Sequence, residues 1–253
     1  MFTEERQQQM LQYVQERQRA AVSELSETFG VSEATVRRDL KELEEAGLLR
    51  RTHGGAITRE AVGVEPSFLE KRDRFADEKQ RIAKEAACLI EKNEIVLLDS
   101  GTTTYQLAKL LKRRSPLTIV TNSHQILQEL QWAEHLELIS TGGTVRRETL
   151  SLVGPLAERG LSMMKVDKLF LGTNGLHPEE GVTTPHLLEA QVKQAMIRSA
   201  KEVVLLCDHS KLNKTTFAKV CPLSAIDTLI TDRGISADLL DQIKNDGTDV
   251  ILA

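Results

Sequence analysis

Residues 31–55, VSEATVRRDLKELEEAGLLRRTHGG, decide how the first part of the chain folds. Val36, Leu40 and Leu43 follow one another at the i, i+4, i+7 spacing of a buried helical stripe. Gly47 comes directly after the last periodic turn, where a helix commonly ends in glycine. The spacing therefore predicts one amphipathic helix that ends near Gly47.

Two further helices are expected before this one. Apolar spacing predicts a helix over 4–17, and a short second helix follows near 24–29. Gly30 permits a sharp turn, and Ser32 is a good N-cap for the next helix. A helix, a tight turn and a second helix with basic and hydroxyl side chains near its start are typical of major-groove recognition.

A short hairpin is predicted directly after the third helix. Residues 48–52 are expected to form a strand, 53–55 its turn and 56–58 the return strand. The stretch 46–59 holds three arginines and no acid, so the hairpin is suited to phosphate or to the minor groove. A three-helix interaction module with a solvated basic pair is the alternative, but the agreement of turn, cap, stripe and hairpin favours DNA binding.

The same segment resembles the DeoR family of bacterial transcriptional regulators, on residues 31–32, 35–40, 43, 47 and 51–56. The resemblance implies a winged helix-turn-helix with operator DNA as its partner. It assigns DNA contact to Ser32, Thr35, Arg37, Arg38, Lys41, Arg50, Arg51 and His53. Asp39 cannot attract phosphate, so we expect it to be structural and to pair with Arg50 or Arg51.

The charge balance limits how DNA can be bound. The chain of 253 residues has a formal net charge of −4, and residues 1–60 hold 9 Lys and Arg against 11 Asp and Glu, a net charge of 9 − 11 = −2. No global basic field exists, so DNA binding must depend on locally placed cations.

Cysteine use and hydropathy narrow the class of protein. Three widely spaced cysteines without a CxxC motif argue against a disulfide framework and a zinc site, so neither a metal nor a cofactor is expected. The polar N-terminus lacks the pattern of a signal peptide, and no apolar run approaches membrane-spanning length. We therefore expect a cytoplasmic protein that does not associate with membranes.

The length allows two domains, which we place at 1–58 and 77–253. Residues 59–76 lose periodicity and contain Gly63 and Pro66, so they are expected to connect the domains, anchored by Phe68 and Phe75. Beyond them, helices are predicted at 79–90, 103–111 and 123–130, and apolar strands at 94–98, 117–120, 136–139, 168–171, 203–206, 228–230 and 249–252. Strands that alternate with helices predict an α/β domain with a mainly parallel sheet.

Ligands of such sheets bind in the loops beyond the carboxyl ends of the strands. Small polar or charged residues follow five of the predicted strands, and the loop 99–104 opens a helix, as an anion cradle does. The candidate effector-binding residues are Asp99, Ser100, Gly101, Thr102, Thr103, Thr104, Thr121, Asn122, Gly142, Gly143, Gly172, Asn174, Glu189, Lys193, Asp208 and Lys211.

Each of these loops has an ordinary structural explanation when it is taken alone. SGTTT at 100–104 suits a capped helix start, and Gly142-Gly143 suits a tight turn. Glu189 and Lys193 stand at i, i+4, so they can form an ion pair on a solvated helix face or close over a ligand. The joint occurrence of five such loops favours a small polar ligand.

This part of the chain resembles the sensor domain of the DeoR family, which is similar to ribose-5-phosphate isomerase and the CoA transferases. The resemblance is carried by 79–83, 99–104, 121–123, 142–143, 167–172, 189–193 and 208–211. It implies a phosphorylated sugar or related metabolite as effector, and a homodimer or homotetramer. We therefore expect a repressor of a sugar-catabolism operon that the effector releases.

The same similarity raises an enzymatic alternative, either isomerase-like or CoA-transferase-like. An isomerase needs a carboxylate base beside the carbon that is deprotonated. Where the isomerases carry acids, this chain has neutral Thr173 and Asn174, a difference that favours binding without turnover. Glu189 remains a candidate base on another element, and a transferase would need a positioned glutamate nucleophile.

Overall fold

The computed structural model describes residues 3–17, 19–52, 54–58, 66–114 and 116–253. The chain divides into two compact units, Met1–Pro66 and Ser67–Ala253, which are taken one at a time below. Among the helices of the described residues, none combines the length and apolar character needed to cross a membrane.

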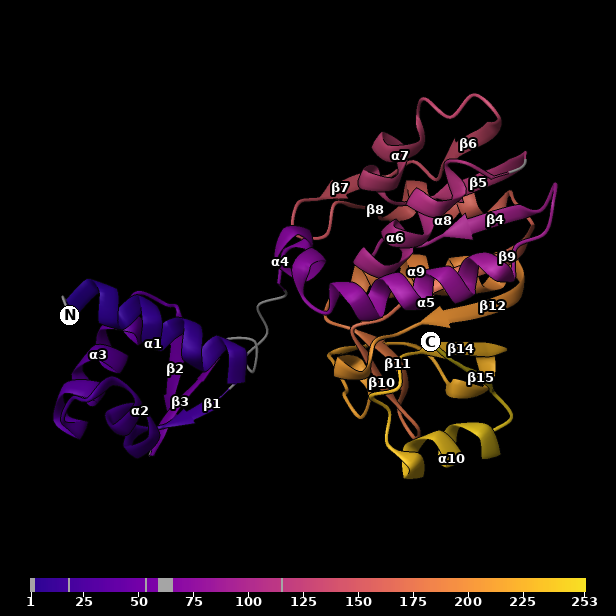
Figure 1. The fold of residues 1–253 in the computed structure, drawn as a ribbon. Coiled ribbons are helices and arrows are strands. Elements are labelled where there is room, and N and C mark those ends of the chain that lie inside the picture. Colours follow the sequence, from indigo (N-terminus) through magenta and orange to yellow (C-terminus); the bar gives the residue numbers. More distant parts are fainter. Residues whose placement is uncertain (1–2, 18, 53, 59–65, 115) are drawn as a thin grey trace. The chain divides into compact units, whose positions relative to one another are not determined.

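The first unit packs three helices against a small antiparallel sheet of order β1-β3-β2 (Figure 1). The hairpin that the sequence predicts is present, and β1 adds a strand that it does not predict. The elements are α1 Thr3–Arg17, β1 Arg19–Ala21, α2 Val22–Phe29, α3 Glu33–Glu45, β2 Leu49–Thr52 and β3 Gly55–Thr58. This arrangement confirms the predicted winged helix-turn-helix.

Helix α3 begins and ends where the sequence predicts. The Ser32 hydroxyl accepts a hydrogen bond from the amide of Thr35, which caps the start. At the end, Gly47 adopts a φ of 74°, and its amide donates to Glu44 while the next amide donates to Leu43. This pair of bonds is a Schellman motif, which needs the left-handed conformation that glycine tolerates.

The expected pairing of Asp39 with Arg51 is wrong, and the side chain of Arg50, the other expected partner, lies outside the described residues. The buried carboxylate of Asp39 accepts from Arg6 Nε at 2.7 Å and from Nη2 at 3.2 Å. Arg6 comes from α1, and Arg51 pairs instead with Glu44 on α3. Asp39 therefore ties α1 to α3 inside the unit, because a buried carboxylate needs a cation close to it.

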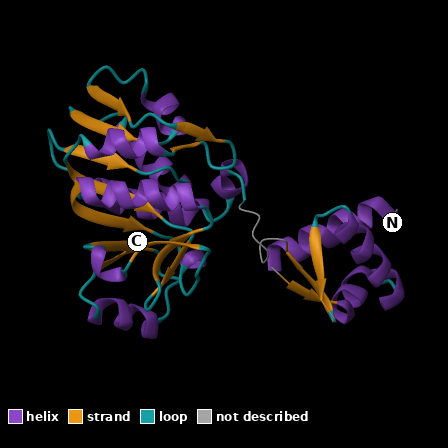
Figure 2. Cartoon of the chain, turned by 180° about the vertical axis from the view of Figure 1, so that it is seen from behind, coloured by secondary structure: helices purple, strands orange, loops and turns teal. Residues whose placement is uncertain are grey.

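The second unit is built on seven parallel strands in the order β15-β14-β12-β9-β4-β5-β6. All seven correspond to predicted strands: β4 Ile95–Leu98, β5 Leu117–Thr121, β6 Leu136–Ser140, β9 Val166–Gly172, β12 Ala200–Leu206, β14 Thr228–Thr231 and β15 Asp249–Leu252. Helices cover both faces (Figure 2): α5 Ala76–Cys88, α6 Thr102–Leu111, α7 His124–Leu130, α8 Pro155–Ser162, α9 Leu187–Ser199 and α10 Ala237–Asn245. The predicted α/β architecture is confirmed.

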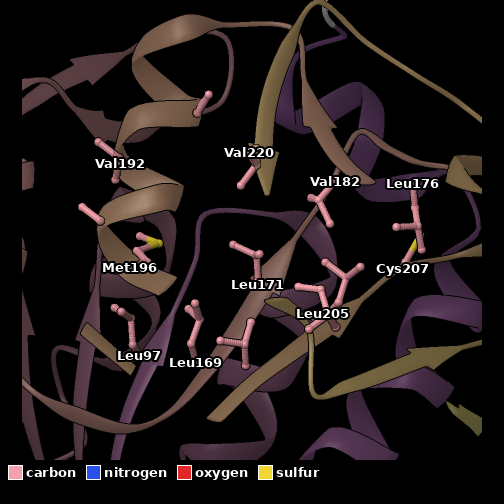
Figure 3. Close-up of a cluster of buried hydrophobic side chains, with 14 of the residues drawn as sticks. Leu97, Leu169, Leu171, Leu176, Val182, Val192, Met196, Leu205, Cys207 and Val220 are labelled. Atoms are coloured by element: carbon pink, nitrogen blue, oxygen red, sulfur yellow. The ribbon is translucent and has the colours of Figure 1, made fainter. Parts of the chain in front are cut away.

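Alternate residues of the central strands enter two separate cores. Leu97 and Leu169 pack with α8 and α9, whereas Leu98 and Phe170 pack with α5 and α6. Figure 3 shows the first core, in which Met196 of α9 lies against the sheet. Burial on both faces explains why these strands are continuously apolar in sequence.

Several short elements have no counterpart in the predictions. They are α4 Phe68–Asp73, which lies inside the expected connection 59–76, and the strands β7 Thr144–Arg146, β8 Ser151–Val153, β10 Gly175–His177, β11 Gly181–Thr184 and β13 Ala218–Cys221. Strands β7 and β8 form a hairpin, and the other three form a second sheet. These strands have only three or four residues and lack the continuous apolar runs that predict the strands of the large sheet, and α4 has only six residues.

Candidate functional site

The exposed face of α3 carries the predicted DNA-contacting residues of the helix. Arg37 pairs with Glu33 at 2.8 Å, and Lys41 lies 3.6 Å from Glu45. Arg38 is exposed, and no ion pair within the described residues engages its guanidinium. The helix therefore presents cations whose weak exposed pairs can exchange for phosphate or base edges.

The wing contributes one described cation. Arg51 on β2 donates from Nε to Glu44 at 2.8 Å, and its amide donates to the same carboxylate. The side chain of Arg50 and the whole of His53 lie outside the described residues. The contact between β2 and α3 sets the position of the wing beside the recognition helix.

The candidate effector residues gather at the carboxyl edge of the seven-stranded sheet. Strands β4 and β9 are neighbours at its centre, and the chain moves from β4 through β5 to β6 on one side and from β9 through β12 on the other. The loops after β4 and β9 meet at this topological switch point, where α/β sheets bind ligands.

A buried ion pair occupies the switch point. Asp99, at 0% exposure, accepts through Oδ2 from the amide of Gly172 at 2.9 Å and from the ammonium of Lys193. Lys193 also donates to the carbonyl of Gly172 at 3.0 Å. Burial raises the pKa of Asp99, although the charge of Lys193 opposes that rise. Among the described residues, Asp99 Oδ1 has no hydrogen-bond partner.

The interpretation of Glu189 and Lys193 as a solvated ion pair is wrong, because each is only 5% exposed and Lys193 pairs with Asp99. Glu189 accepts from Arg146 at 2.9 Å and also from the hydroxyls of Thr149, Ser151 and Thr184. Burial by itself raises the pKa of Glu189, but the Lys193 and Arg146 charges and the Thr149 bond outweigh it and hold the pKa at about 2.

The donors around Glu189 are the part of the site that the sequence does not reveal. Arg146, Thr149 and Ser151 belong to the β7–β8 hairpin and Thr184 ends β11, all short elements without a detectable period. They fix the hairpin against α9 at the edge where the candidate residues gather.

The start of α6 supplies free backbone amides at the same edge. Tyr105 is the first residue whose amide bonds within the helix, to Gly101, so the preceding amides point out of its N-terminus. Thr102 and Thr103 are mostly buried there, and Thr104 donates its hydroxyl to the Asp99 carbonyl at 2.6 Å. The helix start is thus shaped as an anion cradle.

Other candidates at this edge have internal partners. The Asn122 side chain accepts from the Ser100 amide at 2.8 Å, and the Thr121 hydroxyl donates to the Leu98 carbonyl at 2.7 Å. Asn174 Oδ1 lies 3.1 Å from the Thr184 hydroxyl. These groups hold the loops in place around the switch point.

The glycine pair after β6 has a packing explanation. Gly142 and Gly143 have φ angles of 70° and 117°, and a Cβ on Gly143 would lie 2.8 Å from the Val153 carbonyl oxygen. The close approach of the β7–β8 hairpin therefore requires glycine at 143, and the left-handed backbone favours it at 142.

The loop after β12 ends in a short 3₁₀ turn, η2 His209–Lys211. Asp208 caps it by accepting from the amide and hydroxyl of Ser210. His209 Nδ1 lies 2.8 Å from Asp232, and its ring packs against Phe75 at 4.9 Å. Within the described part of the chain, the Lys211 ammonium forms no hydrogen bond or ion pair, so it is available to an anion.

A winged helix-turn-helix followed by an α/β unit defines the class as a DNA-binding protein with a second, α/β domain. Family models agree: residues 6–62 match the DeoR-like helix-turn-helix domain and residues 74–233 match the DeoR C terminal sensor domain. The chain belongs to the DeoR family of transcriptional regulators.

Full-length relatives support the assignment. The chain is 39% identical to the HTH-type transcriptional regulator GlpR of Haloferax volcanii, over 99% of this chain and 98% of that protein. It is 36% identical to a putative aga operon transcriptional repressor of Escherichia coli O157:H7, over 99% and 94%, and 34% identical to the transcriptional repressor GlcR of Bacillus subtilis, over 100% and 97%. These relatives are named as regulators, which confirms the prediction of a regulator rather than an enzyme.

Among solved structures, ribose 5-phosphate isomerase A of Methanocaldococcus jannaschii aligns with 54% of this chain and 54% of its own, at 20% identity and a TM-score of 0.41. A likeness this weak carries no argument about what the chain binds.

Proposed function

We propose that the chain is a repressor of a sugar-catabolism operon and that a phosphorylated sugar or related metabolite releases it from DNA. Two of the relatives named above bear the name repressor, and one of them is named for an operon. Family membership supports operator DNA as the partner of the first unit. Repeated or palindromic half-sites would suit a homodimer or homotetramer.

The observation that carries the effector proposal is the α6 N-terminus beside the buried Asp99–Lys193 pair. Free amides and a helix dipole favour a phosphate group at that end of the helix. Thr103 adds a hydroxyl, and Lys211 in the loop after β12 adds a cation that no ion pair among the described residues engages.

Asp99 gives a reason to expect a sugar rather than phosphate alone. Its Oδ1 atom is buried and lacks a donor among the described residues, a state that costs free energy. A ligand hydroxyl that donates to this oxygen would remove the cost. An anion cradle next to an unsatisfied carboxylate oxygen suits a molecule with a phosphate at one end and hydroxyls at the other.

On DNA, we propose that α3 enters the major groove and that Ser32, Thr35, Arg37 and Arg38 lie nearest the base edges. Lys41 and the wing cations Arg50 and Arg51, with His53, would contact phosphate. The effector can release this complex only if it binds the released arrangement more tightly than the DNA-bound one.

A thermal-shift screen of phosphorylated metabolites tests the effector site. A compound that binds only the folded protein raises the Tm, by an amount that grows with its concentration. We expect a sugar phosphate to raise the Tm of the wild-type chain and to lose this effect in the double variant Thr103→Ala, Lys211→Ala. The matched control is Thr228→Val, at the start of β14 on the opposite edge, which should respond like the wild type. An unchanged shift in the double variant would place the site elsewhere.

A further inference from the structure

Helix α4 is the first described helix after the DNA-binding unit, and the second unit holds its start firmly. The amide of Phe68 donates to the carbonyl of Glu148 at 2.7 Å. The Phe68 side chain is buried, and its ring meets Tyr105 of α6 edge to face at 5.7 Å. A capping box between Ser67 and Glu70 closes the same end.

The far end of α4 is held by a second set of contacts. Phe75 stands in the left-handed region with a φ of 54°, which costs free energy for a residue with a side chain, and its ring packs against His209. Lys79 is only 4% exposed and donates its ammonium to the carbonyls of Lys71 and Arg74. These contacts fix the path of the chain between α4 and α5.

Both holding points belong to loops of the candidate effector edge. Glu148 lies in the turn of the β7–β8 hairpin, between Arg146 and Thr149, which both bond to Glu189 of α9. His209 lies in the loop after β12, fastened by Asp232. Helix α9 also carries Lys193 of the buried pair at the switch point, so the first holding point is linked to the centre of the edge through hydrogen bonds and one helix.

We propose that residues 68–75, the α4 clamp, couple the effector edge to the DNA-binding unit: the β7–β8 turn grips one end of the clamp and the Asp208–Lys211 loop grips the other. The inference rests on the proposed function, because it takes that edge to be the effector site. A ligand that displaces either loop changes the grip on the segment from which the chain continues to the DNA-binding unit. In this proposal the clamp is either held or released, and both the effector and the bound DNA shift the balance between these two states.

Hydrogen–deuterium exchange of the full-length chain tests the coupling without any ligand. Thr149→Val removes the hydroxyl bond to Glu189 beside Glu148, and His209→Ala removes the ring against Phe75. Each variant should speed amide exchange in the α4 clamp by about tenfold, because the local opening becomes easier. Exchange in α10 serves as the internal reference for overall stability.

Matched variants separate coupling from general damage. Thr149→Ser keeps the hydroxyl and should restore wild-type exchange in the clamp. His209→Phe keeps a ring against Phe75 but loses the Nδ1 contact with Asp232, so it should restore most of the protection that His209→Ala loses. Lys168→Met breaks a half-buried ion pair with Glu94 at the opposite edge and should leave the clamp unchanged. Unaltered clamp exchange in Thr149→Val and His209→Ala, with altered exchange in their own loops, would overturn the inference. No phosphorylated metabolite is added in this experiment. Its result is therefore independent of whether the thermal-shift screen finds an effector.

Discussion

Replacing Glu189 with glutamine keeps the shape of the side chain and removes a buried charge on which four donors converge. Its pKa is about 2 in the folded chain, against an ordinary value of 4.5. At about 1.4 kcal/mol per pKa unit, that difference makes the ionised form worth about 3 kcal/mol of stability at neutral pH. Removing one partner from a buried ion pair costs a similar free energy of folding.

The pH dependence follows from the direction of the shift. Because the folded pKa is depressed, the contribution is fully present above pH 4.5 and is lost as the pH falls toward 2. Urea unfolding followed by circular dichroism should therefore show Glu189→Gln less stable than wild type by about 3 kcal/mol at pH 7 and by about half that near pH 3.

The control is Glu137→Gln, because Glu137 is an exposed glutamate on β6. This variant should differ from the wild type by less than about 0.5 kcal/mol at either pH. A Glu189→Gln variant as stable as wild type at pH 7, or one whose deficit does not shrink in acid, would refute the assignment of a stabilising buried charge.

Three further outcomes are expected. Arg38→Ala should weaken binding to a DNA site selected by the wild-type chain by about 1–3 kcal/mol if the guanidinium contacts a base. An unchanged gel-shift titration would show that Arg38 does not contact a base. Gly47→Ala should lower the stability of the DNA-binding unit by about 1 kcal/mol in thermal unfolding, since its φ is 74°; equal melting would contradict the strain argument. Burial lowers the pKa of Lys79 to about 8 from 10.5, so its ammonium destabilises the fold below pH 8 and this cost is relieved between pH 8 and 10.5. Wild type should gain stability relative to Lys79→Met across that range in urea titrations, and a constant difference would argue against the depressed pKa.

The local pattern of the sequence predicts the DNA-binding unit well. Capping by Ser32, the apolar stripe on α3 and the left-handed Gly47 are all short-range features, so the residues that create them also stand close together in the chain. The same holds for the seven strands of the second unit. Their apolar runs are buried on both faces, so each strand can be predicted without knowing which strands lie beside it. The β7–β8 hairpin and the second sheet escape prediction because each strand has only three or four residues and no continuous apolar run.

The sequence by itself determined the class of each unit and the edge at which polar loops collect, because helix and strand periods and parallel topology are read from local spacing. Only the tertiary structure decided the charge partners. Asp39 pairs with Arg6 and not with Arg51, Lys193 pairs with Asp99 and not with Glu189, and Glu189 holds a hairpin. A buried charge pairs with the nearest opposite charge or donor in space. Arg6 and Asp39 are 33 residues apart in the chain, and Asp99 and Lys193 are 94 apart, so no local sequence pattern predicts either pair.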